Sequence, residues 1–281
     1  MKKIIDLILY SNLWIALCAT AMAFQTQYLL VQQLRWTPLL TLITAATLFL
    51  YAIHRIVGIA KVKAFWDMER YAVIAQFKTH ISIYAFLAAV IGAISFFYLK
   101  TIIQISLIIP GIISLAYVLP FLKGKKRLRD FNDIKIFLIA IVWSWITVIL
   151  VSMDYAAYED QRIWILALEK AFFIFAITLP FDIRDLQVDA HSQVKTIPAR
   201  LGIAKTNTLM LTLLAIVSLL VLLNYSLGLY SVGATVAMQI STLLTYFLCR
   251  KSDQIKNDYF FTGLVDGTMI LQSLLVIFFQ G

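Results

Sequence analysis

The sequence predicts an all-α membrane protein, a single-domain bundle of about nine spanning helices that covers residues 1–281. Three observations predict this fold: the composition, the length of the apolar runs and the placement of the basic residues. Of 281 residues, 62% are hydrophobic and only 14% are charged, which is too apolar for a water-soluble fold of this length. We therefore expect the lipid bilayer to surround most of the chain.

The apolar runs are each about 20 residues long, the length that an α-helix needs to cross about 30 Å of hydrocarbon. They lack strand-like alternation, and every backbone amide in lipid needs an internal partner, which leaves helices. The expected spans are residues 11–34, 38–57, 79–99, 102–122, 134–153, 163–180, 206–225, 229–248 and 259–279.

The 24 Lys and Arg residues give the chain a net charge of +9, and most of them lie in alternate loops. By the positive-inside rule we expect these loops, at about residues 58–78, 123–133, 181–205 and 249–258, to be cytoplasmic. The same rule places the N-terminus in the cytoplasm and the C-terminus outside the cell (inner) membrane. Topology and contact with anionic membrane lipids explain the basic excess, so we expect no nucleic-acid partner.

The segment after the sixth span carries the residues that indicate chemistry. On a helix, positions i, i+3 and i+7 share one face, so Asp182, Asp185 and Asp189 would form a row of carboxylates. Such a row repels itself unless a cation bridges it, and Mg²⁺ takes hard oxygen ligands that it shares with substrate phosphates. A solvated acidic loop is the alternative. The basic side chains of Arg184, Lys195 and Arg200 nearby match phosphate and favour the metal site.

Two elements of this segment resemble a signature of the UbiA superfamily of intramembrane prenyltransferases. The run from Asp182 to Asp189 matches D-x-x-D-x-x-x-D, and Thr196-Ile-Pro-Ala-Arg-Leu-Gly202 is similar to the segment that follows in the family. Tyr117-Val-Leu-Pro120, which precedes the basic run from Lys123 to Arg129, also resembles the family. The resemblance implies a nine-helix bundle of the UbiA prenyltransferase type around a lipid-facing cavity, with acidic loops that hold a diphosphate through Mg²⁺.

The resemblance also implies roles for individual residues. Those expected to act are Asp182, Asp185 and Asp189 as catalytic magnesium ligands, Lys195 and Arg200 on the diphosphate, and Tyr117 with the basic loop from Lys123 to Arg129 at the entrance. The implied reaction transfers a polyprenyl group from its diphosphate to a lipophilic or aromatic acceptor. Metal and basic residues would stabilise the departing diphosphate.

The first acidic signature of the family, N-x-x-x-D-x-x-x-D, is replaced in this chain. Aligned on Arg55, its three polar positions fall on Leu50, His54 and Gly58. Leu50 and Gly58 offer no side-chain ligand, and neutral His54 is a poor ligand for magnesium. Arg55 and His54 either contact the diphosphate directly, because guanidinium binds phosphate bidentately, or lie at the helix end and extend to the lipid head groups.

Loss of this signature leaves a second function open. A catalytically inactive UbiA-fold protein would bind an isoprenoid or another lipid, or act as a partner subunit. A secondary transporter fits the number of helices but not their layout, because the sequence has no paired broken helices with polar residues at the midplane. The prenyltransferase is the reading that the second signature favours.

Three charges fall inside expected spans, where charged groups are costly and usually face the protein interior. Glu169 and Lys170 are neighbours in the sixth span that we expect to point in different directions and not to pair. Asp266 lies within Gly263-Leu-Val-Asp-Gly267, a small-xxx-small spacing that indicates close helix packing more than a binding pocket.

Overall fold

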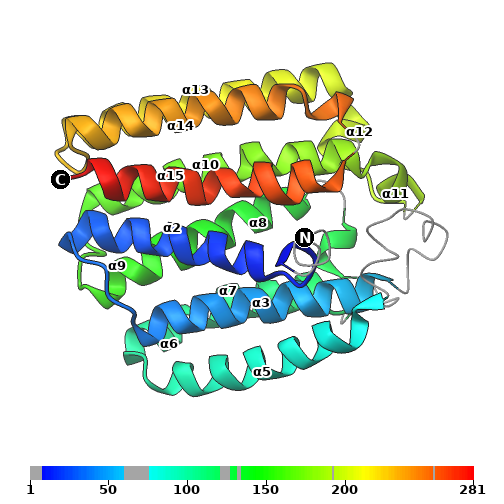
Figure 1. Cartoon of the computed structure of the whole chain (residues 1–281), viewed down its shortest axis with the longest axis horizontal. Coiled ribbons are helices and arrows are strands. Elements are labelled where there is room, and N and C mark those ends of the chain that lie inside the picture. Colours follow the sequence, from blue (N-terminus) through cyan, green and yellow to red (C-terminus); the bar gives the residue numbers. More distant parts are fainter. Residues whose placement is uncertain (1–7, 60–75, 121–126, 132–133, 192, 256) are drawn as a thin grey trace.

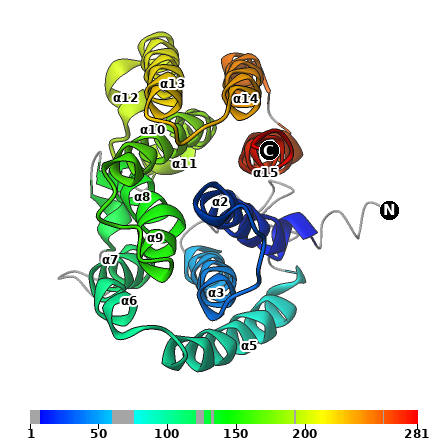
Figure 2. The same ribbon diagram turned by 90° about the vertical axis from the view of Figure 1, so that its left-hand side faces the viewer.

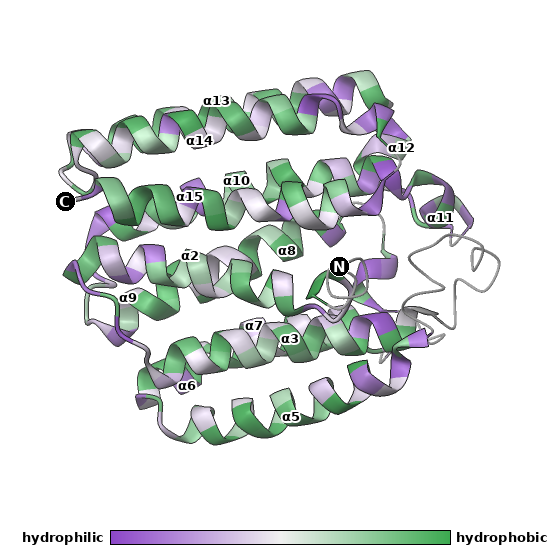
Figure 3. Ribbon diagram, viewed as in Figure 1, coloured by the Kyte–Doolittle hydropathy of each residue, from purple (hydrophilic) through white to green (hydrophobic). Residues whose placement is uncertain are grey.

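A computed structural model describes residues 8–59, 76–120, 127–131, 134–191, 193–255 and 257–281. Within these residues, nine helical segments are long and apolar enough to cross a membrane, and the predicted all-α fold is confirmed. Figure 1 shows the spans lying side by side, with the C-terminus at the end opposite α11. Hydrophobic residues dominate the length of the spans, and hydrophilic residues gather toward their ends (Figure 3).

Most spans are uninterrupted α-helices. These are α2 (Leu13–Val31), α3 (Pro38–Ile59), α5 (Lys78–Phe97), α10 (Gln161–Arg184), α13 (Ile203–Ser226) and α14 (Val232–Arg250). The composite spans are α6 (Thr101–Ser106) with α7 (Ile108–Val118), α8 (Ile134–Ser144) with the π-helical η3 (Trp145–Ile149) and α9 (Leu150–Asp154), and the π-helical η5 (Phe260–Val265) with α15 (Asp266–Phe279). Short helices between spans are η2 (Leu128–Asp130), α11 (Leu186–His191), α12 (Ile197–Leu201) and η4 (Ser252–Gln254).

The spans form a closed ring. Going around it, α2 packs against α3, which contacts α7, and the ring continues through α8, α10, α13, α14 and α15 back to α2 (Figure 2). Helix α5 packs on the outside of α3. Such a ring brings the ends of helices that are distant in sequence to one place. The end of the bundle that carries α11 and α12 is called the site end below.

The fourth span is broken, where the sequence predicts one continuous run. Helix α6 ends at Ser106 and α7 begins at Ile108. The cause is Pro110, which lacks a backbone N–H and whose ring clashes with the carbonyl of the residue four positions earlier, Ser106. Leu107 at the break still donates its backbone N–H to the carbonyl of Ile103, at 2.9 Å, so the two pieces continue as one span.

The expectation that Glu169 and Lys170 do not pair is wrong. The Lys170 ammonium lies 3.4 Å from a Glu169 carboxylate oxygen, and both side chains are fully buried. Lys170 also donates to the side-chain oxygens of Gln25 and Gln272, at 3.1 and 2.7 Å. Both long side chains curl toward the same polar centre of the bundle because lipid offers no partner on the outside. The charges of Lys170 and Glu169 are thus paired inside the bundle, and we assign the cluster to helix packing.

The small-xxx-small segment packs closely, as expected from its spacing. A Cβ added at Gly267 would lie 3.4 Å from the Trp14 indole of α2, and the Trp14 indole nitrogen donates to the carbonyl of Gly263 at 3.2 Å. Asp266, between the two glycines, also lines the cavity described next. The packing motif and the pocket therefore share this segment.

Candidate functional site

A cavity of about 390 Å³ opens inside the ring at the site end. Its charged and polar lining includes His54, Arg55, Arg127, Arg129, Asp130, Lys135, Asp182, Arg184, Asp185, Asp189, Asp258 and Asp266. Its apolar and aromatic lining includes Ile15, Leu50, Tyr51, Ile113, Tyr117, Leu138, Ile139, Val142, Trp143 and Ile146. The cavity thus joins a charged region to an apolar one, which suits an amphiphilic ligand.

The basic wall of the cavity consists of His54 and Arg55 near the end of α3, Arg129 in η2, and Arg127 directly before η2. The Arg129 guanidinium contacts the His54 ring, with Nη1 3.0 Å from Nδ1 and also against Nε2. It lies over the Tyr117 ring, 5.7 Å from the centroid, a cation–π distance. Arg129 has no ion pair with a carboxylate among the described residues. Its guanidinium could therefore bind an anion such as a phosphate.

Arg127 is fixed in place by its neighbour. Its backbone N–H donates to an Asp130 carboxylate oxygen at 3.0 Å, and its Nη2 donates to the other oxygen at 2.7 Å. The remaining Nη1 is buried without a hydrogen-bond partner among the described residues. A buried guanidinium nitrogen without a partner is costly, and in a cavity wall it marks a place where a ligand oxygen would be favourable.

Arg55 forms hydrogen bonds to the protein backbone. Its Nη1 and Nη2 donate to the backbone carbonyls of Tyr10 and Leu9, at 2.5 and 3.3 Å, and its guanidinium lies over the Tyr10 ring at 5.6 Å. Arg55 lines the cavity, yet two of its nitrogens are occupied by backbone oxygens. The structure therefore leaves it fewer donors for a ligand than Arg129 has.

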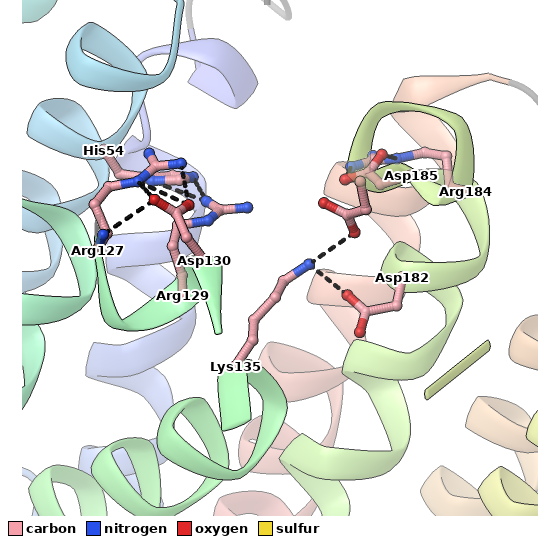
Figure 4. Close-up of polar contacts among 9 residues, drawn as sticks. His54, Arg127, Arg129, Asp130, Lys135, Asp182, Arg184 and Asp185 are labelled. Atoms are coloured by element: carbon pink, nitrogen blue, oxygen red, sulfur yellow. Dashed lines mark hydrogen bonds and ion pairs between the residues drawn. The ribbon is translucent and has the colours of Figure 1, made fainter. Parts of the chain in front are cut away.

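The acidic wall, formed by Asp182, Asp185 and Asp189, lies across the cavity on α10 and α11. Although α10 ends at Arg184, the backbone N–H of Asp189 donates to the carbonyl of Asp185 at 2.9 Å, so the helical register continues across the junction. This continuity brings the carboxylates to one side of the cavity, as a helix with this spacing should. Figure 4 shows the two walls facing each other.

The three carboxylates of the acidic wall already have basic partners. Lys135, in the first turn of α8, places its Nζ 2.6 Å from an Asp182 oxygen and 3.5 Å from an Asp189 oxygen (Figure 4). Asp185 turns instead to Arg184, whose Nε donates to it at 2.9 Å. Arg184 also binds Asp258 across the bundle, at 3.1 Å. In this structure, each carboxylate of the acidic wall is therefore part of an ion pair.

The charges of the two walls act on each other. Burial raises the pKa of the Asp189 carboxyl above its usual value, while the Lys135 ammonium works to lower it. For Arg129, burial acts to lower the pKa, but attraction to Tyr117, Asp189 and Asp185 outweighs it and leaves the pKa raised. Arg129 is thus a permanent cation that faces the acidic wall.

Magnesium does not fit this arrangement of side chains. Magnesium–oxygen distances are about 2.0–2.1 Å, and Lys135 Nζ stands at the position between Asp182 and Asp189 that such an ion would take. The opposite wall offers nitrogen donors where oxygen ligands would be needed. Among the residues that the structure describes, no three or more His, Cys, Asp or Glu side chains are grouped to hold a metal ion.

The remaining predicted site residues are spread out. Tyr117 lines the cavity, whereas Lys123 falls outside the described residues. Lys195 and Arg200 are exposed and are not in the cavity lining. Arg200, on α12, instead lines a second cavity of about 560 Å³, which is otherwise apolar. Helix α12 packs on α10 and α13, and this packing turns Arg200 away from the acidic wall.

Sequence reasoning did not single out Lys135, which lies at the start of the fifth expected span, as a residue of the candidate site. One local signal was available. A lysine in the first turn of an otherwise apolar helix faces the positive end of the helix dipole, which is unfavourable. Such a residue needs carboxylate partners from elsewhere in the fold, and those partners lie 47 and 54 residues later in the sequence.

Comparisons with known proteins agree on the family. Residues 76–273 match the model of the UbiA prenyltransferase family, and a search of curated proteins finds no match.

Three solved structures share the fold. A UbiA homolog from Archaeoglobus fulgidus bound to GPP and Mg²⁺ matches with a TM-score of 0.63 and 13% identity, over 95% of this chain and 99% of that chain. The apo UbiA homolog from Aeropyrum pernix K1 matches with a TM-score of 0.62 and 14% identity, over 97% and 96%. Digeranylgeranylglyceryl phosphate synthase matches with a TM-score of 0.62 and 12% identity, over 100% and 99%. The family match spans more than half of the sequence, and the chain belongs to the UbiA prenyltransferase family.

Proposed function

We propose that this protein is an integral membrane prenyltransferase, which transfers a polyprenyl group from a prenyl diphosphate to a lipophilic or aromatic acceptor. The observation that carries the proposal is the two-part cavity, in which a cluster of charged side chains adjoins an apolar region within the ring of helices. A prenyl diphosphate has the matching division, with an anionic head and a hydrocarbon chain. The Archaeoglobus fulgidus homolog, bound to GPP and Mg²⁺, supports this ligand class.

In the proposed reaction, the bond between the allylic carbon and the diphosphate oxygen breaks, and the diphosphate leaves with the electron pair. The acceptor then donates an electron pair to the allylic cation and loses a proton. The aromatic rings of Tyr51, Tyr117 and Trp143 line the cavity and suit a neighbouring cation, because the face of an aromatic ring attracts positive charge.

The basic wall is the proposed seat of the diphosphate. Arg129 has no carboxylate partner among the described residues, and Arg127 has a buried nitrogen that lacks one. Guanidinium groups in a low-dielectric cavity stabilise the negative charge that grows on a leaving diphosphate. The sequence prediction of Mg²⁺ at Asp182, Asp185 and Asp189 stays a prediction, and it requires Lys135 to leave the acidic wall.

Loss of the first acidic signature supports a second candidate function, an inactive UbiA-fold protein that binds an isoprenoid or acts as a partner subunit. At the signature position α3 presents Leu50, His54 and Gly58 to the cavity. None of these supplies a side-chain oxygen. Binding would survive this change because the basic wall supplies charge in its place, while turnover would depend on whether that charge stabilises the leaving group.

One experiment separates the two candidates. Purified protein in lipid nanodiscs is incubated with geranyl diphosphate and longer prenyl diphosphates, together with a lipid extract as the acceptor source, and both binding and diphosphate release are measured. Binding with release supports the transferase, and binding without release supports the inactive form. Absence of binding for every chain length, with and without Mg²⁺, would contradict the transferase and an inactive form that binds prenyl diphosphates, and would leave only the partner subunit.

A further inference from the structure

The Lys135 ammonium occupies the centre of the acidic wall. It lies 2.6 Å from Asp182 and 3.5 Å from Asp189, and the side chains of the closer pair are only 10% and 3% exposed. We propose that Lys135 is a built-in cation that takes the place of a divalent metal ion, so that the diphosphate of the substrate binds to this chain without metal. This inference rests on the proposed function.

Lys135 occupies the position between one oxygen of Asp182 and one oxygen of Asp189. A magnesium ion that bridged these two oxygens at about 2.0–2.1 Å would fall on or beside the nitrogen, and the two positive charges would repel. A metal can therefore bridge these oxygens only if the lysine leaves them. In leaving, Lys135 would give up a buried charge-assisted contact, which is costly.

Lys135 also has enough hydrogen-bond donors for this role. An ammonium group carries three N–H donors, and the two carboxylates of the acidic wall take two of them. The third remains for a phosphate oxygen in the cavity that Lys135 lines. The ammonium would then bridge carboxylate and phosphate, as a metal ion shared between protein and substrate does.

The basic wall provides the second, independent observation. Beside His54, which stands at the position of an acid of the first signature, the chain places Arg129, and Arg127 lines the same wall. Arg127 is only 6% exposed, and its Nη1 has no hydrogen-bond partner among the described residues. Together with Lys135, these side chains put fixed positive charge on both sides of the cavity.

The test measures binding of a non-hydrolysable geranyl diphosphate analogue to the full chain in nanodiscs, by calorimetry, first in EDTA and then in Mg²⁺. Wild type should bind equally well in both buffers, within about threefold, because its cations are covalently attached. Lys135→Met keeps the length of the side chain but removes the charge. This variant should bind on the order of tenfold to a hundredfold more weakly in EDTA and should recover in Mg²⁺, because Asp182 and Asp189 are then free to hold the ion.

The matched control is Lys100→Met. Lys100 also pairs with an aspartate, Asp154, at 3.7 Å, but it lies outside the cavity lining. Its substitution should change affinity in neither buffer. Lys135→Arg, which keeps the charge, should retain binding in EDTA and serves if the methionine variant does not fold.

A measurement with Mn²⁺ alone separates this inference from the proposed function. By electron paramagnetic resonance, Lys135→Met should bind Mn²⁺ without any diphosphate, and wild type should not. The inference is overturned if wild type requires Mg²⁺ for the analogue, if it binds Mn²⁺ as the variant does, or if Lys135→Met behaves like wild type in EDTA. No binding of the analogue in either buffer would instead overturn the proposed function, and the Mn²⁺ result would still decide the role of Lys135.

Discussion

The two walls of the cavity are built alike, each from the site end of a spanning helix and a short helix outside the spans, yet they differ in charge. The acidic wall keeps all three carboxylates of its family signature, and Lys135 and Arg184 pair with them. The basic wall has lost the acids of its signature and carries arginines, two of which reach the cavity without a full set of partners. The comparison teaches that side chains supply positive charge on both walls. Lys135 and Arg184 pair with carboxylates of the acidic wall, whereas Arg129 has no carboxylate partner among the described residues.

The largest expected effect follows from removing Arg129 from the basic wall. Arg129→Gln should weaken binding of a prenyl diphosphate analogue by on the order of a hundredfold, because a charge-assisted contact in a buried site is lost. Arg250→Gln is the matched control, because Arg250 also lies over a tyrosine ring, that of Tyr246 at 6.0 Å, but outside the cavity lining. Calorimetry on both variants checks this, and equal affinity would show that the basic wall is not the diphosphate seat.

The acidic wall should respond in stability, and unequally along its length. Asp182→Asn breaks the buried contact with Lys135 and should lower the free energy of unfolding by about 3 kcal/mol. Asp185→Asn, whose side chain is 22% exposed and pairs with Arg184, should cost less than about 1 kcal/mol. Thermal unfolding in nanodiscs compares the two. A larger loss for Asp185→Asn would contradict the assignment of Lys135 as the main partner of the wall.

Arg55 and His54 provide a smaller contrast within the basic wall. Arg55→Ala should weaken binding of the analogue by less than about tenfold, because two of its nitrogens already serve the carbonyls of Tyr10 and Leu9. His54→Ala should have a still smaller effect, because only Arg55 carries a permanent charge. Side-by-side titrations of the two variants test the order. An unchanged affinity in Arg55→Ala would assign that residue to anchoring the chain near Tyr10.

The smallest effect is expected from single cysteine substitutions that test on which side of the membrane the two walls lie. These substitutions should leave the affinity for the analogue unchanged. Single cysteines at the exposed positions His191 and Asp253 should be labelled from the cytoplasm, and one at Tyr158 from the other side of the membrane. The native thiols Cys18 and Cys249 are buried, so background labelling should be low. Labelling of positions 191 and 158 from the same side would break the predicted topology and the placement of both walls.

Much of the fold follows from local properties of the sequence. The length and composition of the apolar runs are enough to place the spans, because a helix in lipid satisfies its backbone internally. The break between α6 and α7 also has a local cause, because Pro110 prevents the regular helical hydrogen bond to the carbonyl of Ser106. The carboxylate row of the acidic wall also follows from helical spacing and needs no knowledge of other helices.

The partners of that row depend on tertiary structure, which the pattern does not specify. Lys135 meets Asp182 only because α8 and α10 are neighbours in the ring. Lys195 and Arg200 show the opposite case. They lie close to the acidic signature in sequence, but the packing of α12 leaves them exposed and outside the cavity lining. Nearness along the chain was a poor guide to nearness in the site.

The most direct test of this account is an experimental structure of the wild-type chain with a non-hydrolysable geranyl diphosphate analogue, prepared in EDTA. The account predicts that the diphosphate lies between the walls, with Arg129 and Lys135 donating to its oxygens and with Lys135 still bound to Asp182. A diphosphate bound elsewhere, or one that enters only with Mg²⁺ at Asp182 and Asp189 after Lys135 has moved away, would contradict it.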